Sequence, residues 1–202
     1  MSRPDDLERL TAALRFAYSG ELAAARAYRG HWRSVRNPED RAHILKIENE
    51  EWRHRDLVGA MLSRIGAAPS RERERRARRV GRTLGFLCHV VGWLPPMYGA
   101  GRLESRNIKE YETAARLAVK AGRPELVDCL LAMAEIEWDH EQYFRSRVQA
   151  HRLAPWLPLW PAPPPRSEIR DSFSREIIAM GPAPIEPPRD GARAGLRTAA
   201  GS

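Results

Sequence analysis

The chain has 202 residues and a formal net charge of +8 at pH 7. Hydrophobic residues make up 43% of it and charged residues 30%, which excludes an intrinsically disordered chain and suits one domain with a full core. No uninterrupted apolar run reaches the roughly 18–20 residues that a membrane-spanning helix needs. The first residues lead directly into a charged segment, so we expect no secretory signal and a cytoplasmic location.

Positive charge is concentrated in one segment of the chain. Arg71–Arg82 contains seven Arg and two Glu, a net charge of +5, whereas residues 153–202 contribute only +1. A local basic segment favours a docking patch for an anionic partner over general polyanion binding. No aromatic residues are interleaved with the arginines, so we expect no nucleic-acid partner.

Four segments have the apolar spacing of amphipathic helices. The predicted helices run over about 6–29, 38–65, 98–121 and 124–151. The second has the clearest start, because Asn37 is a good N-cap and Pro38 suits the first helical position. Gly66 and Gly122 are expected to end the second and third helices. The short connections after the first and third helices predict two antiparallel hairpins.

A longer connection, 67–97, separates the two hairpins. A segment of this length can run along a whole bundle, so we predict an all-α fold: a ferritin-like four-helix bundle over residues 1–152 with one long crossover. The crossover joins the arginine-rich segment to a mostly apolar stretch, Leu84–Leu94. Residues 153–202 predict an irregular Pro-rich tail, extended at 154–165, with a short helix near 166–180 and a disordered end.

Each apolar seam of the four helices is interrupted by a glutamate, and two seams also by a histidine. The interruptions are Glu21, Glu51, His54, Glu104, Glu137 and His140. Burying an isolated carboxylate is costly unless it has a partner. Residues three apart share a helix face, so each Glu-x-x-His pair can reach one metal ion. One Glu from each of two helices and a Glu-x-x-His from each of the others is the ligand arrangement of di-iron and di-manganese carboxylate bundles.

The residue types favour two Fe ions, with Mn as the alternative, because zinc prefers four-coordinate sites. Such a pair of ions can react with O₂ or peroxide without an organic cofactor. Tyr111, seven residues after Glu104, is a candidate catalytic residue for electron or proton transfer, although a packed core tyrosine is the alternative. Glu48, one turn before Glu51, is a candidate for a supporting contact to a ligand. The alternative is that the four glutamates are solvated surface charges and that the two histidines are hydrogen-bonded residues of the core.

These motifs resemble the demethoxyubiquinone hydroxylases, the ferritin-like di-iron enzymes of ubiquinone biosynthesis. The similarity covers about residues 6–151 and is closest at Ser19–Gly30, where a Gly-Glu pair is followed by Tyr and Gly. Glu51-Trp-Arg-His54 and Glu137-Trp-Asp-His140 resemble the family's second- and fourth-helix motifs. Leu103-Glu104 through Tyr111 resembles the third.

The resemblance implies that the six residues are iron ligands. It also implies a monooxygenase that hydroxylates a hydrophobic, quinone-like substrate with O₂ and electrons from an external donor, while resting on a membrane. The arginine-rich start of the crossover and the Pro-rich tail depart from the family's pattern, which leaves the substrate open. A ferritin-like peroxidase or catalase, an iron-storage protein and a non-catalytic lipid-binding bundle are the alternatives.

The crossover itself also points to a membrane. An apolar stretch, Leu84–Leu94, beside the basic Arg71–Arg82 segment is typical of a peripheral contact with an anionic bilayer, here on its inner face. The alternative is that the stretch covers the bundle while the arginines are solvated. An oligomer is compatible with either reading.

Overall fold

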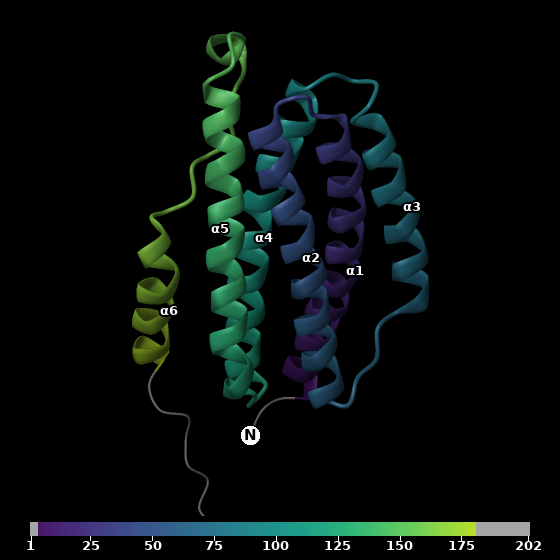
Figure 1. Ribbon diagram of the computed structural model, residues 1–202. Coiled ribbons are helices and arrows are strands. Elements are labelled where there is room, and N and C mark those ends of the chain that lie inside the picture. Colours follow the sequence, from purple (N-terminus) through teal and green to yellow (C-terminus); the bar gives the residue numbers. More distant parts are fainter. Residues whose placement is uncertain (1–3, 181–202) are drawn as a thin grey trace, which may run out of the picture.

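The computed structural model describes residues 4–180, and in that range the chain is all-α, with no strand (Figure 1). The prediction of an all-α fold is confirmed. The α-helices are α1 Pro4–Ser34, α2 Pro38–Arg64, α3 Arg71–Leu87, α4 Leu94–Lys120, α5 Val127–Gln149 and α6 Arg166–Met180. Two short 3₁₀ helices, η1 Pro124–Leu126 and η2 Ala154–Trp156, precede and follow α5. None of the helices in this range is long and apolar enough to cross a membrane.

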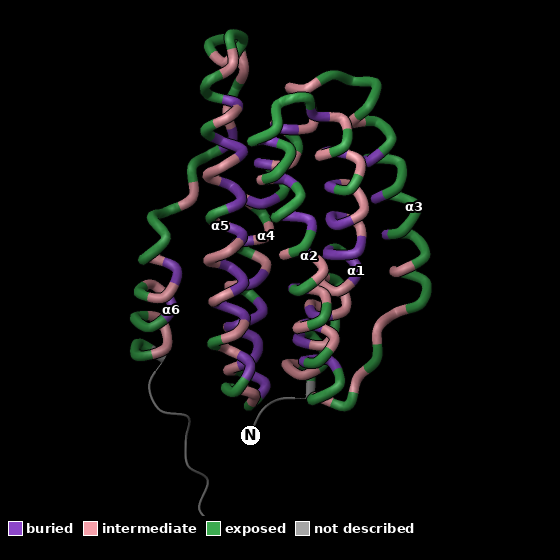
Figure 2. Tube along the Cα trace, viewed as in Figure 1, coloured by how far each residue is buried: buried purple, intermediate pink, exposed green. Residues whose placement is uncertain are grey.

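Four long helices, α1, α2, α4 and α5, lie side by side, and α3 and α6 flank them (Figure 1). The pairs α1–α2 and α4–α5 are antiparallel hairpins with short connections, as predicted. Helix α3 packs along the outer side of α1, whereas α6 lies against α5. The buried residues gather between the long helices, and most of α3 is exposed (Figure 2).

The helix boundaries follow the local capping signals. The Asn37 side chain accepts hydrogen bonds from the backbone N–H groups of Glu39 (2.8 Å) and Asp40 (3.0 Å), which fixes the start of α2. Gly66 and Gly122 have positive φ angles of 72° and 68°, a conformation that glycine adopts easily after a helix.

Two of the long helices are longer than the sequence predicted. Helix α1 runs over Pro4–Ser34 instead of 6–29, and α4 begins at Leu94 instead of 98. Pro95 and Pro96 lie inside the first turn of α4, where the missing backbone N–H groups would have no helical partner.

Helix α3 is the largest difference from the sequence prediction, which treated residues 67–97 as a crossover without a helix of its own. Ser70 caps its first turn by accepting from the N–H of Arg73 (3.4 Å). It approaches α1 through glycines: a Cβ atom on Gly81 or Gly30 would overlap the backbone of the facing helix. The predicted Leu84–Leu94 stretch is divided, because α3 ends at Leu87 and the chain then turns into α4.

The first part of the Pro-rich segment is anchored to the four long helices. Residues 157–165 have no regular structure, and helix α6 follows at the predicted position. The Trp160 ring is buried over Gly101 and donates from Nε1 to Glu141 (2.6 Å). Arg145 donates to the carbonyl of Trp160 (3.2 Å), which holds this segment on α5. The predicted disordered end lies outside the described residues.

Two apolar clusters fill the space between the long helices, one near each end. The first includes Leu14, Val58 and Ile108, and the second includes Ile47 and Phe144. The glutamates that interrupt the seams lie between these clusters, so the polar residues occupy a middle layer with an apolar core on either side.

Candidate metal centre

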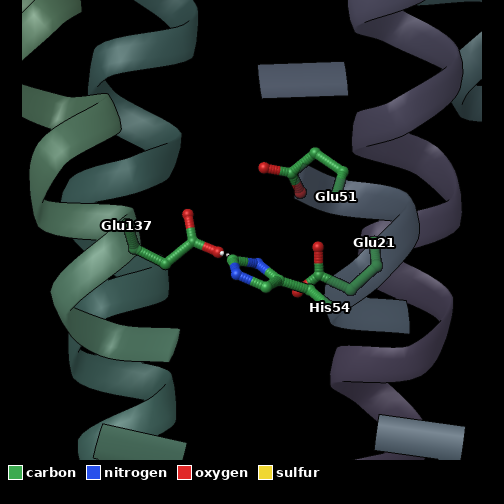
Figure 3. A group of neighbouring side chains, drawn as sticks. All are labelled: Glu21, Glu51, His54 and Glu137. Carbon is green, nitrogen blue, oxygen red and sulfur yellow. Dashed lines mark hydrogen bonds and ion pairs between the residues drawn. The ribbon is translucent and has the colours of Figure 1, made fainter. Parts of the chain in front are cut away.

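All six residues predicted as ligands are buried in this middle layer. None exposes more than 4% of its surface: Glu21 4%, Glu51 0%, His54 0%, Glu104 0%, Glu137 0% and His140 2%. They come from α1, α2, α4 and α5, and Figure 3 shows four of them pointing toward one another. Burial excludes the alternative of solvated surface charge for these residues.

The six side chains form two overlapping groups. In the first, ligand atoms of Glu21, Glu51, His54 and Glu137 all lie within 4.8 Å of one another. In the second, the same holds for Glu51, Glu104, Glu137 and His140. Glu51 and Glu137 belong to both groups, whereas Glu21 and Glu104 belong to one each. The sequence left open which glutamates would be shared, and the geometry selects the two that precede the histidines.

Several atoms in these groups have no hydrogen-bond partner within residues 4–180. They are Glu21 Oε2, both carboxylate oxygens of Glu51, His54 Nε2, Glu137 Oε2 and His140 Nδ1. Buried polar atoms are nearly always paired, because leaving one unpaired costs about 1–3 kcal/mol. A cation coordinated by oxygen and imidazole nitrogen would satisfy all of them. The donor set therefore fits a metal, and the buried Glu/His groups could hold one.

The two imidazoles are oriented by carboxylates. His140 Nε2 donates to Glu50 (2.9 Å), so its Nδ1 faces Glu51 at 3.4 Å and Glu137 at 3.5 Å. His54 Nδ1 donates to Glu137 (3.0 Å) and leaves Nε2 unbonded within the described chain. Metal-binding histidines commonly donate their second N–H to a carboxylate, which fixes the tautomer. Glu50 could not be selected from the sequence, because its contact joins α2 to α5 and no spacing rule predicts it.

Glu21 and Glu104, the glutamates that belong to one group each, each accept a hydrogen bond from a tyrosine of the opposite helix. Tyr111 of α4 donates to Glu21 of α1, and Tyr28 of α1 donates to Glu104 of α4. Both tyrosines are at most 3% exposed. Tyr111 was predicted as a candidate catalytic residue; it is a packed core residue and also contacts a candidate ligand. Sequence analysis did not select Tyr28, although the same Glu-x₆-Tyr spacing in both helices would have identified it.

Glu48 is buried, but its hydrogen bonds go to residues other than the six candidate ligands. Its oxygens accept hydrogen bonds from Arg29 (2.7 Å), Trp32 (2.7 Å) and Trp52 (3.3 Å). These contacts join α1 to α2 beside the centre. The supporting contact that the sequence suggested for Glu48 is made instead by Glu50, and by Asn107, which donates to Glu104 (2.8 Å).

The electrostatics of the centre favour protons when no cation is present. Burial, followed by the charge of Glu137, raises the pKa values of Glu51 and Glu104 well above normal. Burial acts in the same direction on Glu137, but the adjacent His140 ring and the hydrogen bond from His54 hold its pKa below normal. Burial opposes the charged form of His140, yet the adjacent carboxylates of Glu137 and Glu50 raise its pKa well above 6.5. A bound cation would take the place of these protons.

Two cavities lie along the α1–α4 side of the centre. The larger, of about 410 Å³, is an open cavity bounded by α1, the end of α3 and α4, and has Tyr28 in its lining. The smaller, of about 170 Å³, has Glu21 and Tyr111 in its lining. Ala24 and Leu103 line both cavities and separate them. Each cavity therefore reaches one of the two Glu–Tyr pairs.

Comparisons of the chain with protein-family models, with curated proteins and with solved structures gave no match. The class that the structure defines is an all-α protein with a buried carboxylate–histidine cluster that could hold metal ions.

Proposed function

We propose that the chain is a ferritin-like, di-iron monooxygenase that uses O₂ to hydroxylate a hydrophobic, quinone-like substrate. The observation that carries the proposal is the pair of overlapping buried groups, in which Glu51 and Glu137 are common to both. This arrangement matches two ions with shared carboxylates better than one ion with six ligands. Two bound irons would supply the reaction with O₂ and the transfer of electrons from an external donor.

The residues of the chain have separate tasks in this proposal. The four glutamates and two histidines hold the metals, with Mn as the alternative to Fe. Glu50 fixes the ring of His140, and Tyr28 and Asn107 orient Glu104. Tyr111 donates its O–H group to Glu21 and is the residue we assign to proton or electron transfer. The apolar clusters on either side exclude water from the centre.

A hydrophobic substrate is supported by the larger cavity. Its lining is mostly apolar, and it reaches Tyr28, whose O–H group contacts Glu104. Pockets of about 300–1,000 Å³ are typical of small-molecule sites, and this cavity lies within that range. A catalase-type protein, the main alternative, would need no apolar cavity of this size beside its metals.

Metal analysis after anaerobic purification tests the centre. We expect two irons per chain in the unmodified protein and their loss in Glu51→Ala and His140→Ala. Glu48→Gln is the matched control, because Glu48 is equally buried but bonded elsewhere. Less than about 0.2 equivalents of any metal in the unmodified protein would rule out the proposed centre.

A labelled-oxygen experiment separates the hydroxylase from the catalase alternative. The iron-loaded protein, a chemical reductant and a short-chain quinol are incubated under ¹⁸O₂. We expect one ¹⁸O atom in the organic product. Rapid decomposition of hydrogen peroxide with no label in the quinol would favour the catalase-type protein instead.

The proposal also includes contact with an anionic membrane surface through α3. Arg75, Arg76, Arg78 and Arg79 are exposed there. The exposed side chains Leu84, Phe86 (66% exposed) and Val90 (62% exposed) lie at the end of α3 and just beyond it. Exposed cations next to exposed apolar groups are suited to the interface of an anionic bilayer.

Liposome flotation tests this contact. Changing the four arginines to Ala should abolish flotation with vesicles that contain anionic lipid. The control changes four exposed arginines outside α3, namely Arg9, Arg53, Arg106 and Arg152, to Ala. Equal flotation of both variants would show that α3 is not the anchor.

A further inference from the structure

The two groups of the metal centre are related by an approximate repeat of the chain. Each hairpin has a Glu-x₆-Tyr pair on its first helix and a Glu-Trp-x-His motif on its second. The contacts of the two motifs correspond as well. Nδ1 of His54 lies 3.0 Å from Glu137 (Figure 3), and Nδ1 of His140 lies 3.4 Å from Glu51. Each histidine therefore turns Nδ1 toward the glutamate of the other motif, which leaves Nε2 for a further partner.

The repeat is broken at the residue directly before each motif, which is Glu50 in α2 and Ile136 in α5. Glu50 accepts a hydrogen bond from Nε2 of His140 (2.9 Å). By the same correspondence, the residue that would take this role for His54 is Ile136, whose side chain has no hydrogen-bonding atom. Nε2 of His54 has no hydrogen-bond partner within residues 4–180. One histidine of the centre is therefore supported by a carboxylate, and the other is not.

A carboxylate on the second nitrogen of a histidine affects how well that histidine binds a metal. It holds the ring in one orientation and makes the ligating nitrogen a better electron donor, and its loss typically lowers metal affinity by about 10–100-fold. The group of Glu51, Glu104, Glu137 and His140 has this support from Glu50. The group that contains His54 lacks it in the described chain. An ion in the first of these groups should therefore be held more tightly than an ion in the second.

We infer that the two metal positions are inequivalent: the position at His140 fills first and holds its ion more tightly, and Glu50 is the positioning residue that makes the difference. The inference rests on the metal centre of the proposed function but not on the hydroxylation reaction. Both ions would share Glu51 and Glu137, so the first ion weakens binding of the second even between equal positions. Two unequal binding steps are therefore not sufficient evidence, and the test exchanges the residues that break the repeat.

Removing the carboxylate is the first half of the exchange. The full, metal-free chain is titrated with Fe²⁺ under anaerobic conditions in a calorimeter, and the dissociation constants of the first and second ions are measured. Glu50→Ile gives His140 the same surroundings as His54. We expect it to weaken the first step at least about tenfold and to change the second by no more than about twofold, because only the tighter position loses its support. Glu50→Asp, which keeps a carboxylate, should weaken the first step less than Glu50→Ile does.

Supplying the missing carboxylate is the second half. Ile136→Glu gives His54 the partner that Glu50 gives His140, so it should strengthen the second step by about tenfold or more and leave the first nearly unchanged. A gain in affinity cannot result from a misfolded chain. Glu135→Ile is the matched control, because Glu135 is also a partly buried glutamate beside the motif, but it pairs with Arg170 (2.8 Å) instead of a histidine. This variant should keep both steps.

Either of two results would overturn the inference: a first step that Glu50→Ile leaves unchanged, or a second step that Ile136→Glu does not strengthen. Two bound irons with affinities that ignore both substitutions would remove the inference and leave the proposed function standing. The expected response to both substitutions, without ¹⁸O in the quinol product, would do the reverse. A chain that binds no Fe²⁺ would overturn both.

Discussion

The middle layer of the four long helices and the outer helix α3 are both rich in charged residues, but in opposite surroundings. In the middle layer, four carboxylates and two imidazoles are at most 4% exposed. On α3, all seven arginines of Arg71–Arg82 are exposed, and most of the helix lies on the surface (Figure 2). Water solvates the charges of α3 at little cost, whereas the buried charges depend on partners inside the protein.

This difference decides what each region reveals about its ligand. Unpaired buried atoms require a partner of defined size and charge, so the middle layer points to cations. Solvated arginines need no further partner, so their charge alone does not indicate a ligand. Helix α3 indicates a binding surface only because exposed apolar residues lie beside its arginines. The two regions should therefore respond differently to metals, to pH and to substitution.

The largest expected effect is stabilisation by metal. Anaerobic addition of Fe²⁺ to metal-free protein should raise the free energy of unfolding by about 4 kcal/mol for each bound ion when the metal is at a thousandfold excess over its Kd. Urea denaturation with and without Fe²⁺ measures this effect. The chain with four α3 arginines changed to Ala should be stabilised equally, since those residues are exposed. An unfolding midpoint that does not change when Fe²⁺ is added would contradict the buried metal centre.

The next largest effect separates the two regions physically. Gly81→Val places side-chain atoms against the Ala23 backbone and should push α3 away from α1. We expect a loss of about 1–3 kcal/mol in stability, typical of overpacking, with the metal content unchanged. Urea denaturation and metal analysis check the two parts. Gly20→Ala, where a Cβ meets open space, is the control, and loss of metal in Gly81→Val would show that the regions are coupled.

A neutral residue in the centre should stabilise the metal-free protein while removing its metals. Burial raises the pKa of Glu51, so its charged form is unfavourable in the folded chain. Glu51→Gln keeps nearly the same shape without a titrating group and should add about 1 kcal/mol of stability at pH 7, because folding then no longer requires residue 51 to take up a proton. Urea denaturation in the presence of a chelator gives the stability. A destabilised Glu51→Gln chain would indicate that Glu51 has a structural role.

The pH dependence of the metal-free chain follows from the same shifts. A glutamate whose pKa is raised above 4.5 contributes stability that is lost as pH rises through its folded value, and the raised pKa of His140 acts in the same direction above 6.5. Stability should therefore fall as the pH rises above 4.5, and less steeply in Glu104→Gln. Metal affinity should rise over the same range, because binding releases protons. Stability and metal affinity that both rise, or both fall, with pH would contradict the raised pKa values of Glu104 and His140.

The smallest effect on stability per substituted residue belongs to α3. Changing Arg75, Arg76, Arg78 and Arg79 to Ala should alter the free energy of unfolding by no more than about 0.5 kcal/mol per residue, because each is solvated. The same variant should lose membrane flotation completely. A large loss of stability, measured by urea denaturation, would show that the arginines support the packing of α3 on α1.

Local patterns in the sequence were sufficient for the four long helices and the six candidate ligands. Apolar spacing and capping residues such as Asn37 and Gly66 act within a few residues of chain, so they can be recognised without knowledge of the fold. The same patterns did not predict the helix over residues 71–87. Its face toward α1 consists of the small residues Ala77, Gly81 and Gly85, which recur at helical spacing but are weaker signals of a packed helix than large apolar side chains.

The sequence by itself determined that carboxylates and imidazoles fall on the inner faces of four helices, because helical periodicity assigns each residue to a face. Only the tertiary structure decided that Glu51 and Glu137 are shared, that Glu50 orients His140, and that Tyr28 mirrors Tyr111. The physical reason is that these contacts join different helices. They depend on how the helices are placed along and around one another, which the packing of the apolar clusters sets.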